Sequence, residues 1–255
     1  MSIARRAAAE FIGTALLLVA VVGSGIAAQR LSPHDTGLQL LENSLATGAA
    51  LVAIILALGS VSGAHLNPVV SLVDAALGRM DRRHLAPYLA AQTGGAITGV
   101  IVANLMFSLP AVTVAEHARS SPNLWLGEVV ASFGLLLVIH GASRNGGGAG
   151  VPYAVGAYIT GAYWFTSSTS FANPAVTVAR MLSNSFAGIA PASVPGFVLA
   201  QLAGAALAAG AVRLLWPSSG VTAGASSPRQ SITLEPGLST FGGVDPPVAA
   251  GPKRA

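Results

Sequence analysis

Two asparagine–proline pairs place side chains with hydrogen-bonding groups inside an apolar chain. Asn67-Pro68-Val69 and Asn173-Pro174-Ala175 each follow a run of small and polar residues, and each begins a short apolar stretch. Asparagine is a preferred N-cap and proline is favoured at the first helical position, so each pair predicts the start of a helix. Helix starts carry partial positive charge and unpaired N–H groups. Together with the two amides, they would bind an uncharged polar solute and oppose cations.

The composition indicates a membrane protein. Of the 255 residues, 53% are hydrophobic and only 9% are charged, whereas soluble domains have about 25% charged residues. The net charge is +4, but the basic residues form no dense stripe, so we expect no nucleic-acid partner. Cysteine is absent, which excludes disulfides, thiolate metal sites and cysteine nucleophiles.

Eight apolar segments must position these groups. A bilayer core of roughly 30 Å needs about 20 helical residues, and six segments reach or approach that length: 7–28, 39–59, 87–107, 124–141, 151–165 and 194–216. The first is interpreted as a transmembrane helix rather than a cleaved signal peptide. Two further segments, 67–77 and 173–182, span only half a bilayer. Such re-entrant half-helices must be buried in protein or line a water-filled cavity.

The same motifs recur in the same order in the two halves of the chain. The first half contains Glu10, Asn67-Pro68 and Ala91-Gln92, and the second contains Glu128, Asn173-Pro174 and Ala200-Gln201. Each half, at about 4–107 and 122–216, therefore holds three spans and one half-helix. An odd number of spans forces the halves into opposite orientations. The predicted fold is an all-α membrane protein with six transmembrane helices and two re-entrant half-helices in an inverted repeat.

Charge placement predicts the topology. With a cytoplasmic N-terminus, ten basic residues fall on the inner side and three on the outer side, namely Arg30, Arg119 and Arg180. This distribution follows the positive-inside rule and puts both termini in the cytoplasm. We therefore expect one channel domain at 1–216. The remainder, 217–255, is rich in Pro, Gly, Ser and Thr and is predicted to be a disordered cytoplasmic tail.

The paired Asn-Pro motifs in duplicated contexts resemble those of the major intrinsic proteins, the aquaporins and aquaglyceroporins. The resemblance covers about 4–216. It implies that Asn67 and Asn173 face a pore, and that Glu10 and Glu128 accept hydrogen bonds from the backbone of the re-entrant loops. A proton relay is the alternative role for these carboxylates. Gln92 and Gln201 are expected to line or brace the helix interface. Val69 departs from the alanine that is usual in the first motif.

The predicted selectivity filter also departs from the family pattern. Most relatives carry arginine directly after the second motif, whereas this chain has Val176, and its next arginine is Arg180. Family spacing places the other filter positions at Thr47, Gly161 and Ser170. These four residues predict a wide and weakly polar opening. Valine in place of that arginine resembles bacterial members associated with arsenic resistance, which implies conduction of arsenite and related neutral metalloid hydroxides.

Several alternatives remain open at this stage. A general glycerol, urea or water facilitator is the alternative substrate assignment, and an ion-coupled secondary transporter or a tetramer with a shut pore are alternatives of other classes. His65 and His140 have no metal-ligand spacing, and neither a metal, a cofactor nor a catalytic group is predicted. Small residues at Gly95, Gly99, Gly204 and Ala208 could serve internal packing or contacts between protomers. The resemblance implies a homotetramer in the inner membrane of a bacterium.

Overall fold

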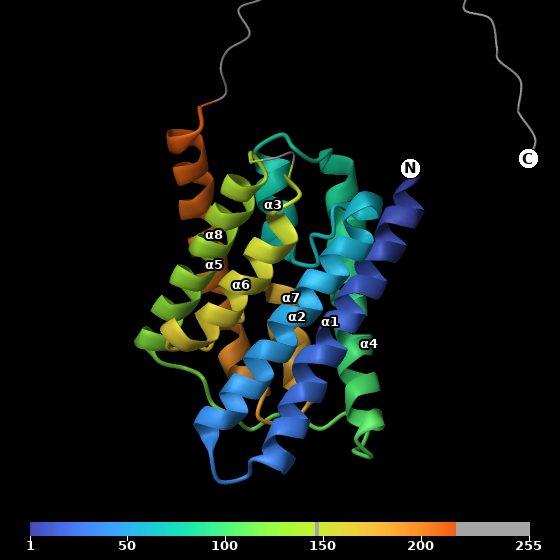
Figure 1. The fold of residues 1–255 in the computed structure, drawn as a ribbon, viewed down its shortest axis with the longest axis vertical. Coiled ribbons are helices and arrows are strands. Elements are labelled where there is room, and N and C mark those ends of the chain that lie inside the picture. Colours follow the sequence, from blue (N-terminus) through green and yellow to red (C-terminus); the bar gives the residue numbers. More distant parts are fainter. Residues whose placement is uncertain (146–147, 218–255) are drawn as a thin grey trace, which may run out of the picture. The chain divides into compact units, whose positions relative to one another are not determined.

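The computed structural model describes residues 1–145 and 148–217, and the regular structure in these residues is helical throughout. The described residues form eight α-helices, which are labelled in Figure 1. Their bounds are Ile3–Leu31 (α1), Thr36–Ser62 (α2), Pro68–Ala76 (α3), Leu85–Met106 (α4), Pro122–Ala142 (α5), Val151–Phe165 (α6), Pro174–Ala179 (α7) and Val194–Leu215 (α8). Short 3₁₀ turns occupy Arg82–His84 (η1), Arg180–Leu182 (η3) and Pro191–Ser193 (η4). Residues 218–255 of the predicted tail lie outside the described residues.

The lengths of these helices match the predicted pattern of spans and half-spans. Within the described residues, five helices are long and apolar enough to cross a membrane: α1, α2, α4, α5 and α8. The α6 helix has 15 residues, which rise roughly 22 Å, less than a full bilayer core. The half-helices α3 and α7 have nine and six residues. The all-α membrane fold is confirmed.

The packing of the helices repeats between the two halves. In the first half α1 packs on α2 and α4, and in the second α5 packs on α6 and α8. The α2 and α6 helices contact each other across the two halves, while α3 and α7 each contact both α4 and α8. The two half-helices also contact each other, so they meet inside a wall of longer helices (Figure 1). This arrangement buries their ends in protein, as a lipid environment requires.

Glycines allow the closest helix pairs to approach. A Cβ atom at Gly95 would lie 2.2 Å from Phe11 O, and one at Gly204 would lie 2.5 Å from Val129 O. Real Cβ atoms do not approach other atoms this closely, so the α1–α4 and α5–α8 pairs depend on the missing side chains. Small residues are the usual means of close packing between membrane helices. Of the two roles that the sequence left open, internal packing is the one that these glycines have.

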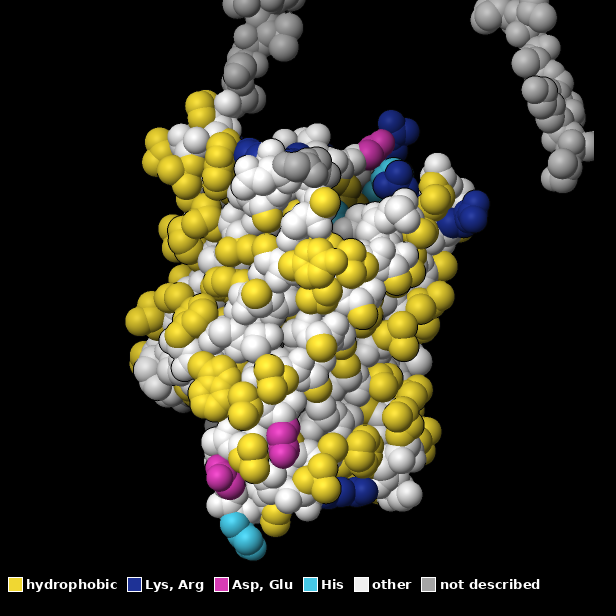
Figure 2. Space-filling model, viewed as in Figure 1, with side chains coloured by type: hydrophobic (Ala, Val, Ile, Leu, Met, Phe, Trp, Pro, Cys, Tyr) yellow, Lys and Arg dark blue, Asp and Glu magenta, His cyan; other side chains and the backbone are white. Residues whose placement is uncertain are grey.

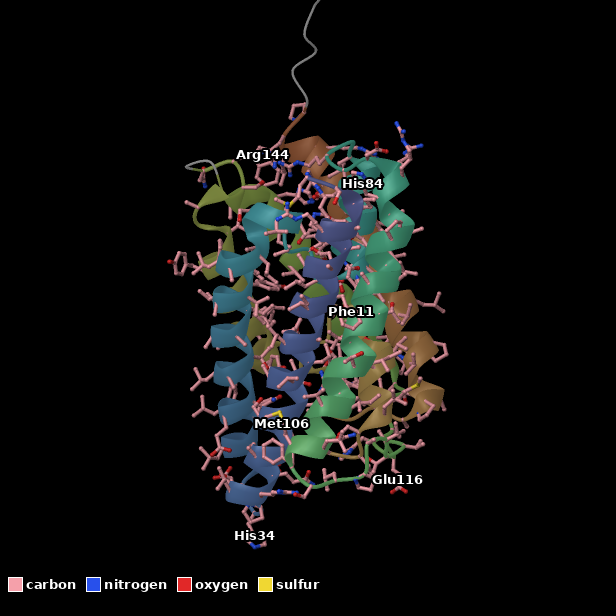
Figure 3. The ribbon with its side chains drawn as sticks, turned by 90° about the vertical axis from the view of Figure 1, so that its right-hand side faces the viewer. Phe11, His34, His84, Met106, Glu116 and Arg144 are labelled. Atoms are coloured by element: carbon pink, nitrogen blue, oxygen red, sulfur yellow. The ribbon has the colours of Figure 1, made fainter. Side chains whose placement is uncertain are left out.

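Charged groups gather at the two ends of the molecule. Figure 2 shows Lys, Arg, Asp, Glu and His side chains at the upper and lower ends, with apolar and uncharged surface between them. In Figure 3, His84 and Arg144 lie at one end, while His34 and Glu116 lie at the other. Exposed apolar side chains on the intervening helices include Leu45, Leu56, Leu126 and Leu207. A surface with this pattern suits a protein surrounded by lipid.

Candidate pore and filter

The side chains of Asn67 and Asn173 cap the two half-helices. Asn67 Oδ1 accepts from the Val69 N–H at 3.0 Å. Asn173 Oδ1 accepts from the Ala175 N–H at 3.0 Å and from the Val176 N–H at 3.2 Å. Each helix begins at the following proline, where the missing N–H costs nothing. The predicted helix starts are confirmed.

The amide nitrogens of the same two asparagines join the two halves. Asn67 Nδ2 donates to Ala172 O and Asn173 Nδ2 donates to Leu66 O, both at 2.8 Å. An amide nitrogen has two N–H groups, so one on each asparagine is left for another acceptor. Both asparagines line the same cavity. Their remaining N–H groups can therefore donate to a solute in it.

Two buried carboxylates hold the loops that precede the half-helices. Glu10 accepts from the backbone N–H groups of His65 at 3.0 Å and Leu66 at 2.7 Å. Glu128 accepts from those of Phe171 at 2.9 Å and Ala172 at 2.8 Å. Both carboxylates are fully buried, and hydrogen bonds of this kind offset much of the cost of burying their charge. This is the arrangement that the family resemblance implies.

A glutamine links each carboxylate to a half-helix. Gln92 Nε2 donates to Glu10 Oε2 at 2.8 Å and to Ser71 Oγ on α3 at 3.0 Å. In the second half, Gln201 Nε2 donates to Glu128 Oε2 at 2.6 Å and to Thr177 Oγ1 on α7 at 2.8 Å. None of these groups lines the cavity. Two roles were considered for the glutamines, lining or bracing the helix interface, and these contacts show that they brace it.

The loops have an unusual backbone that needs this support. Ala64 and Leu66 have φ of 46° and 53°, and Ser170 and Ala172 have φ of 49° and 48°. These are left-handed conformations, which cost an L-residue with a side chain roughly 1–2 kcal/mol each. In each half, one of these two residues lies three positions before the asparagine and the other lies directly before it. The carboxylate bonds to the neighbouring N–H groups therefore stabilise a strained loop in both halves.

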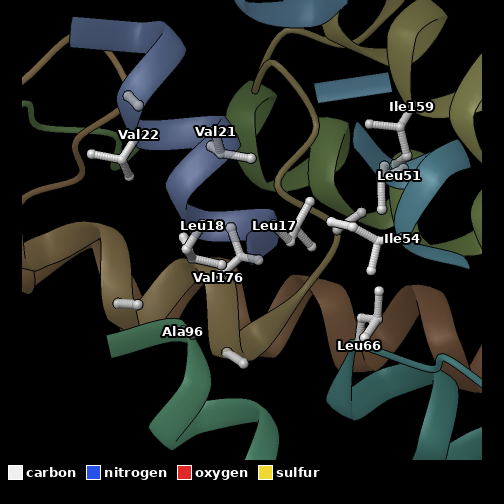
Figure 4. Close-up of a cluster of buried hydrophobic side chains, with 14 of the residues drawn as sticks. Leu17, Leu18, Val21, Val22, Leu51, Ile54, Leu66, Ala96, Ile159 and Val176 are labelled. Carbon is white, nitrogen blue, oxygen red and sulfur yellow. The ribbon is translucent and has the colours of Figure 1, made fainter. Parts of the chain in front are cut away.

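A cavity of about 630 Å³ passes the two asparagines. Its lining extends from Asp74 and Arg79 on one side of them to Val176 and Arg180 on the other. Three residues of the predicted filter, Thr47, Ser170 and Val176, belong to this lining. Figure 4 shows Val176 close to the apolar side chains of α1, including Leu17, Leu18 and Val21.

The fourth predicted filter residue, Gly161, does not line the cavity. On α6 the lining residues are Val151, Pro152, Val155, Ile159 and Tyr163, and four of them, 151, 155, 159 and 163, follow the four-residue spacing of one helix face. A Cβ atom at Gly161 would instead point toward Phe165. The hydroxyl of Tyr163, on the lining face of α6, lies 3.2 Å from Thr47 Oγ1, and the filter role of Gly161 stays a prediction. In the sequence, the apolar residues at four-residue spacing on α6 indicated this face. The prediction of Gly161 was based instead on a count from the second motif, which crosses an irregular loop.

Arg180 is buried beside the second half-helix. Its side chain is 2% exposed and lines the cavity. The guanidinium lies 3.5 Å from the centre of the Phe171 ring, and Nε donates to Ala187 O. Arg119, from the loop between α4 and α5, lies over the same ring at 5.2 Å. Burial lowers the pKa of the Arg119 guanidinium, and the Glu128 carboxylate partly offsets this shift.

Val69 lies away from the cavity. It is fully buried in a cluster with Val73, Leu136 and Ala205, while the next residue, Val70, lines the cavity. The departure from the usual alanine at this position therefore fills space between helices and leaves the lining of the cavity unchanged.

A charged cluster that the sequence did not reveal lies at the other end of the cavity. His65 Nε2 is 3.3 Å from Asp74 Oδ2, and His140 Nε2 is 3.6 Å from Asp74 Oδ1. Arg79 contacts His140 through Nη1. His140 is 61 residues from Arg79 in the chain, and sequence spacing gave no sign that it meets the other three residues. Within 1–145 and 148–217, no group of His, Cys, Asp and Glu has the geometry of a metal site.

Known proteins resemble this chain in sequence and in structure. The family model described as major intrinsic protein matches residues 1–162. Aquaglyceroporin AqpS of Rhizobium meliloti (strain 1021) is 52% identical over 211 residues, covering 83% of this chain and 90% of that protein. Aquaporin Z of Bradyrhizobium diazoefficiens is 33% identical over 245 residues, covering 88% of this chain and 98% of that protein.

A solved structure has the same fold. The X-ray structure of the aquaglyceroporin from Plasmodium falciparum matches with a TM-score of 0.68 and 22% sequence identity, covering 85% of this chain and 98% of that chain. The sequence matches show the family, and the structural match agrees with them in fold. The chain belongs to the major intrinsic protein family, as a multi-pass aquaglyceroporin channel for small uncharged solutes and not an enzyme.

Proposed function

We propose that the channel conducts arsenite and related neutral metalloid hydroxides, passively and in either direction, across the inner membrane of a bacterium. The observation that carries this proposal is Val176, which lines the cavity directly after the second motif. Most relatives have arginine there. Valine at this position resembles bacterial members of the family associated with arsenic resistance.

The chemistry of the solute fits the cavity. Arsenous acid is an uncharged triol of about the size of glycerol. Thr47, Ser170 and the two motif asparagines offer hydrogen-bonding groups along the lining, and Leu17, Val21 and Val176 offer apolar surface. A site with a few polar groups in a largely apolar wall orients a small solute without holding it strongly. The absence of cysteine also leaves no thiol to trap trivalent arsenic.

General conduction of glycerol, urea and water is the second candidate function. The hydroxyl pair of Thr47 and Tyr163 favours it, because such groups bind any solute with hydroxyl or amide groups. The two candidates predict different rank orders of solute permeability, but the mechanism, passive conduction, is the same. Arsenite should pass faster than glycerol and urea if the first is correct.

An ion-coupled transporter would need carboxylates that exchange protons or ions. Glu10 and Glu128 are instead engaged by backbone N–H groups and by the glutamines. This use of the carboxylates supports a passive pore. Solute flux should therefore be the same with and without proton or sodium gradients.

The orientation and assembly are part of the same proposal. We expect residues 1–216 to form the channel with both termini in the cytoplasm. The N-terminus, His84 and Arg144 lie at one end of the molecule (Figures 1 and 3), where the basic side chains are more numerous. Because Arg180 is buried in the cavity, the opposite end holds only Arg30 and Arg119 of the described basic residues. The homotetramer remains an expectation from the family.

The test is uptake into liposomes that contain the purified protein, with water, glycerol, urea and arsenite measured side by side. Val176→Arg should reduce arsenite and glycerol flux more than water flux. Val176→Met is the matched control, since it adds length without charge. Equal loss of all four fluxes in Val176→Arg would contradict the role of Val176, and absence of conduction by the unmodified protein would favour a shut pore.

A further inference from the structure

We propose that a second cavity, at the end of the molecule that carries the N-terminus, binds a phosphate group through Arg6 and Arg79. This cavity, the side pocket, has a volume of about 410 Å³ and shares part of its wall with the pore cavity. The proposal goes beyond the proposed function, because it concerns a charged ligand beside the pore and does not depend on which neutral solute passes through it.

Segments from distant parts of the chain form the wall of the side pocket. Its lining consists of Arg6 on α1, residues 59–63 at the end of α2, Arg79–Asp81 before η1, and His65, His84 and Tyr88. Two arginines and two histidines among these residues face one carboxylate. Basic pockets between membrane helices are a known means of binding phosphate-bearing headgroups. The composition of the wall therefore favours an anion.

Arg6 has an unused donor in this wall. Its Nε is buried and has no hydrogen-bond partner in the described residues, and an unpaired buried N–H is costly. Glu10 lies one turn farther along α1, but its carboxylate already accepts from Ser62 Oγ and from the backbone of the loop before α3. Phosphate oxygens match the planar fork of donors that a guanidinium presents. A phosphate group in the side pocket would supply the missing acceptor.

Arg79 lies at the boundary between the side pocket and the pore cavity, since it lines both. Its Nη1 contacts the His140 ring, and its Nη2 donates to Ser143 Oγ at 3.3 Å. These contacts hold the guanidinium in place. Because a guanidinium has five N–H groups, donors remain for a ligand. A phosphate group bound here would lie beside the mouth of the pore cavity.

The negative charges around the side pocket are weaker than the positive ones. Asp81 Oδ1 accepts from the Arg83 N–H at 2.9 Å, and Asp81 Oδ2 is 3.5 Å from Arg83 Nε. The end of α2 contributes only about half a negative charge, whereas Arg6 and Arg79 carry a full positive charge each. Lys, Arg and His side chains also gather at this end of the molecule (Figure 2). The local field therefore attracts an anion.

The experiment measures the melting temperature of the detergent-solubilised full-length protein, because a ligand of the folded state raises it. One arm adds inorganic phosphate, with chloride at equal ionic strength as its reference. The other adds phosphatidylglycerol, with phosphatidylcholine as its reference. A rise in the first arm assigns the site to a soluble phosphate, and a rise confined to the second assigns it to a lipid headgroup.

Two substitutions locate the site. Arg6→Gln should weaken the apparent affinity for the active probe by roughly tenfold, the size expected for losing a hydrogen bond to a charged group. Arg5→Gln is the matched control, since it removes the same charge from an exposed neighbour that does not line the side pocket. Ser60→Glu places a carboxylate at an exposed position of the wall and should abolish binding, whereas Ser60→Gln should not.

The absence of a rise in both arms would overturn the proposal. Equal losses in Arg5→Gln and Arg6→Gln would do the same, because they would indicate a general attraction to the basic surface. If Arg6→Gln does not fold, Ser60→Glu decides, and unchanged affinity in it would contradict binding in the side pocket. None of these outcomes depends on solute flux, so arsenite and glycerol uptake test the proposed function separately.

Discussion

The two half-helices share a framework but differ in the charge that they present to the pore. Val70 on α3 and Val176 on α7 both come three residues after the asparagine, and both line the cavity. Four residues later α3 carries Asp74, whereas α7 leads to Arg180, and these also line the cavity. The repeat therefore places an acidic and a basic group at equivalent positions on opposite sides of the asparagines.

The surroundings of these two charges also differ. Asp74 is close to His65 and His140, so its charge has nearby partners. Arg180 is held by a carbonyl oxygen and an aromatic ring. By contrast, the Glu–Gln brace behind each half-helix is nearly identical in the two halves. The groups that hold the loops are therefore alike in the two halves. The charged groups that line the cavity differ between them.

The largest effect is expected from the braces. Glu10→Gln and Glu128→Gln replace an acceptor with an amide that faces several donors, so both should lower the melting temperature of the detergent-solubilised protein and abolish most flux. Each hydrogen bond to a charged group contributes about 1.5–3 kcal/mol. Glu10→Gln should be the more severe, because Glu10 also accepts from Ser62 Oγ at 2.6 Å.

Glu116→Gln is the control for this pair, since Glu116 is exposed at one end of the molecule. Its melting temperature should equal that of the unmodified protein. Normal stability of Glu10→Gln would show that the first loop does not depend on its carboxylate.

Arginine introduced at the two equivalent valines should have unequal effects. At position 70 it would be four residues from Asp74, a spacing that favours an ion pair, whereas at position 176 it would face Arg180. Val176→Arg should therefore reduce glycerol flux several-fold more than Val70→Arg in liposome swelling. Equal losses would mean that added bulk, rather than charge, blocks the pore.

Much of this framework could be predicted from the sequence, because it depends on local rules. Asn-Pro predicts a helix start wherever it occurs, and hydrophobic length distinguishes spans from half-spans. The repeat then relates Glu10 to Glu128. These features arise within single segments or from their order along the chain.

The cavity lining was harder to predict because it depends on which face each helix turns inward. Counting back from Asn173 selected Gly161, but the count crosses an irregular loop, and on α6 Tyr163 rather than Gly161 lines the cavity. The sequence placed Arg180 one turn past Val176 on the half-helix but did not predict its burial, which accompanies stacking on the Phe171 ring. The contacts of Asp74 with His65 and His140 join separate helices and loops, which spacing alone does not reveal.

A smaller effect is expected at the helix contacts that both halves share. Gly95→Ala would place Cβ 2.2 Å from Phe11 O, and Gly204→Ala would place it 2.5 Å from Val129 O. Both should lower the melting temperature, Gly95→Ala by more, because such overpacking typically costs about 1–3 kcal/mol. Gly210→Ala on α8 has no atom within 4 Å and should be neutral or slightly stabilising. A loss of stability in Gly210→Ala equal to the others would point to backbone effects rather than contact distance.

The smallest effect on transport is expected at Val69, the position where the two motifs differ. Val69→Ala makes the first motif match the second, and it removes two methyl groups from a fully buried cluster. Stability should fall by roughly 1–2 kcal/mol, as expected for that loss of apolar burial. The permeability ratios among water, glycerol and arsenite should stay the same, because Val70 and not Val69 lines the cavity. A change in these ratios would show that packing behind α3 sets the width of the pore, and that the two half-helices are less alike in their framework than their hydrogen bonds indicate.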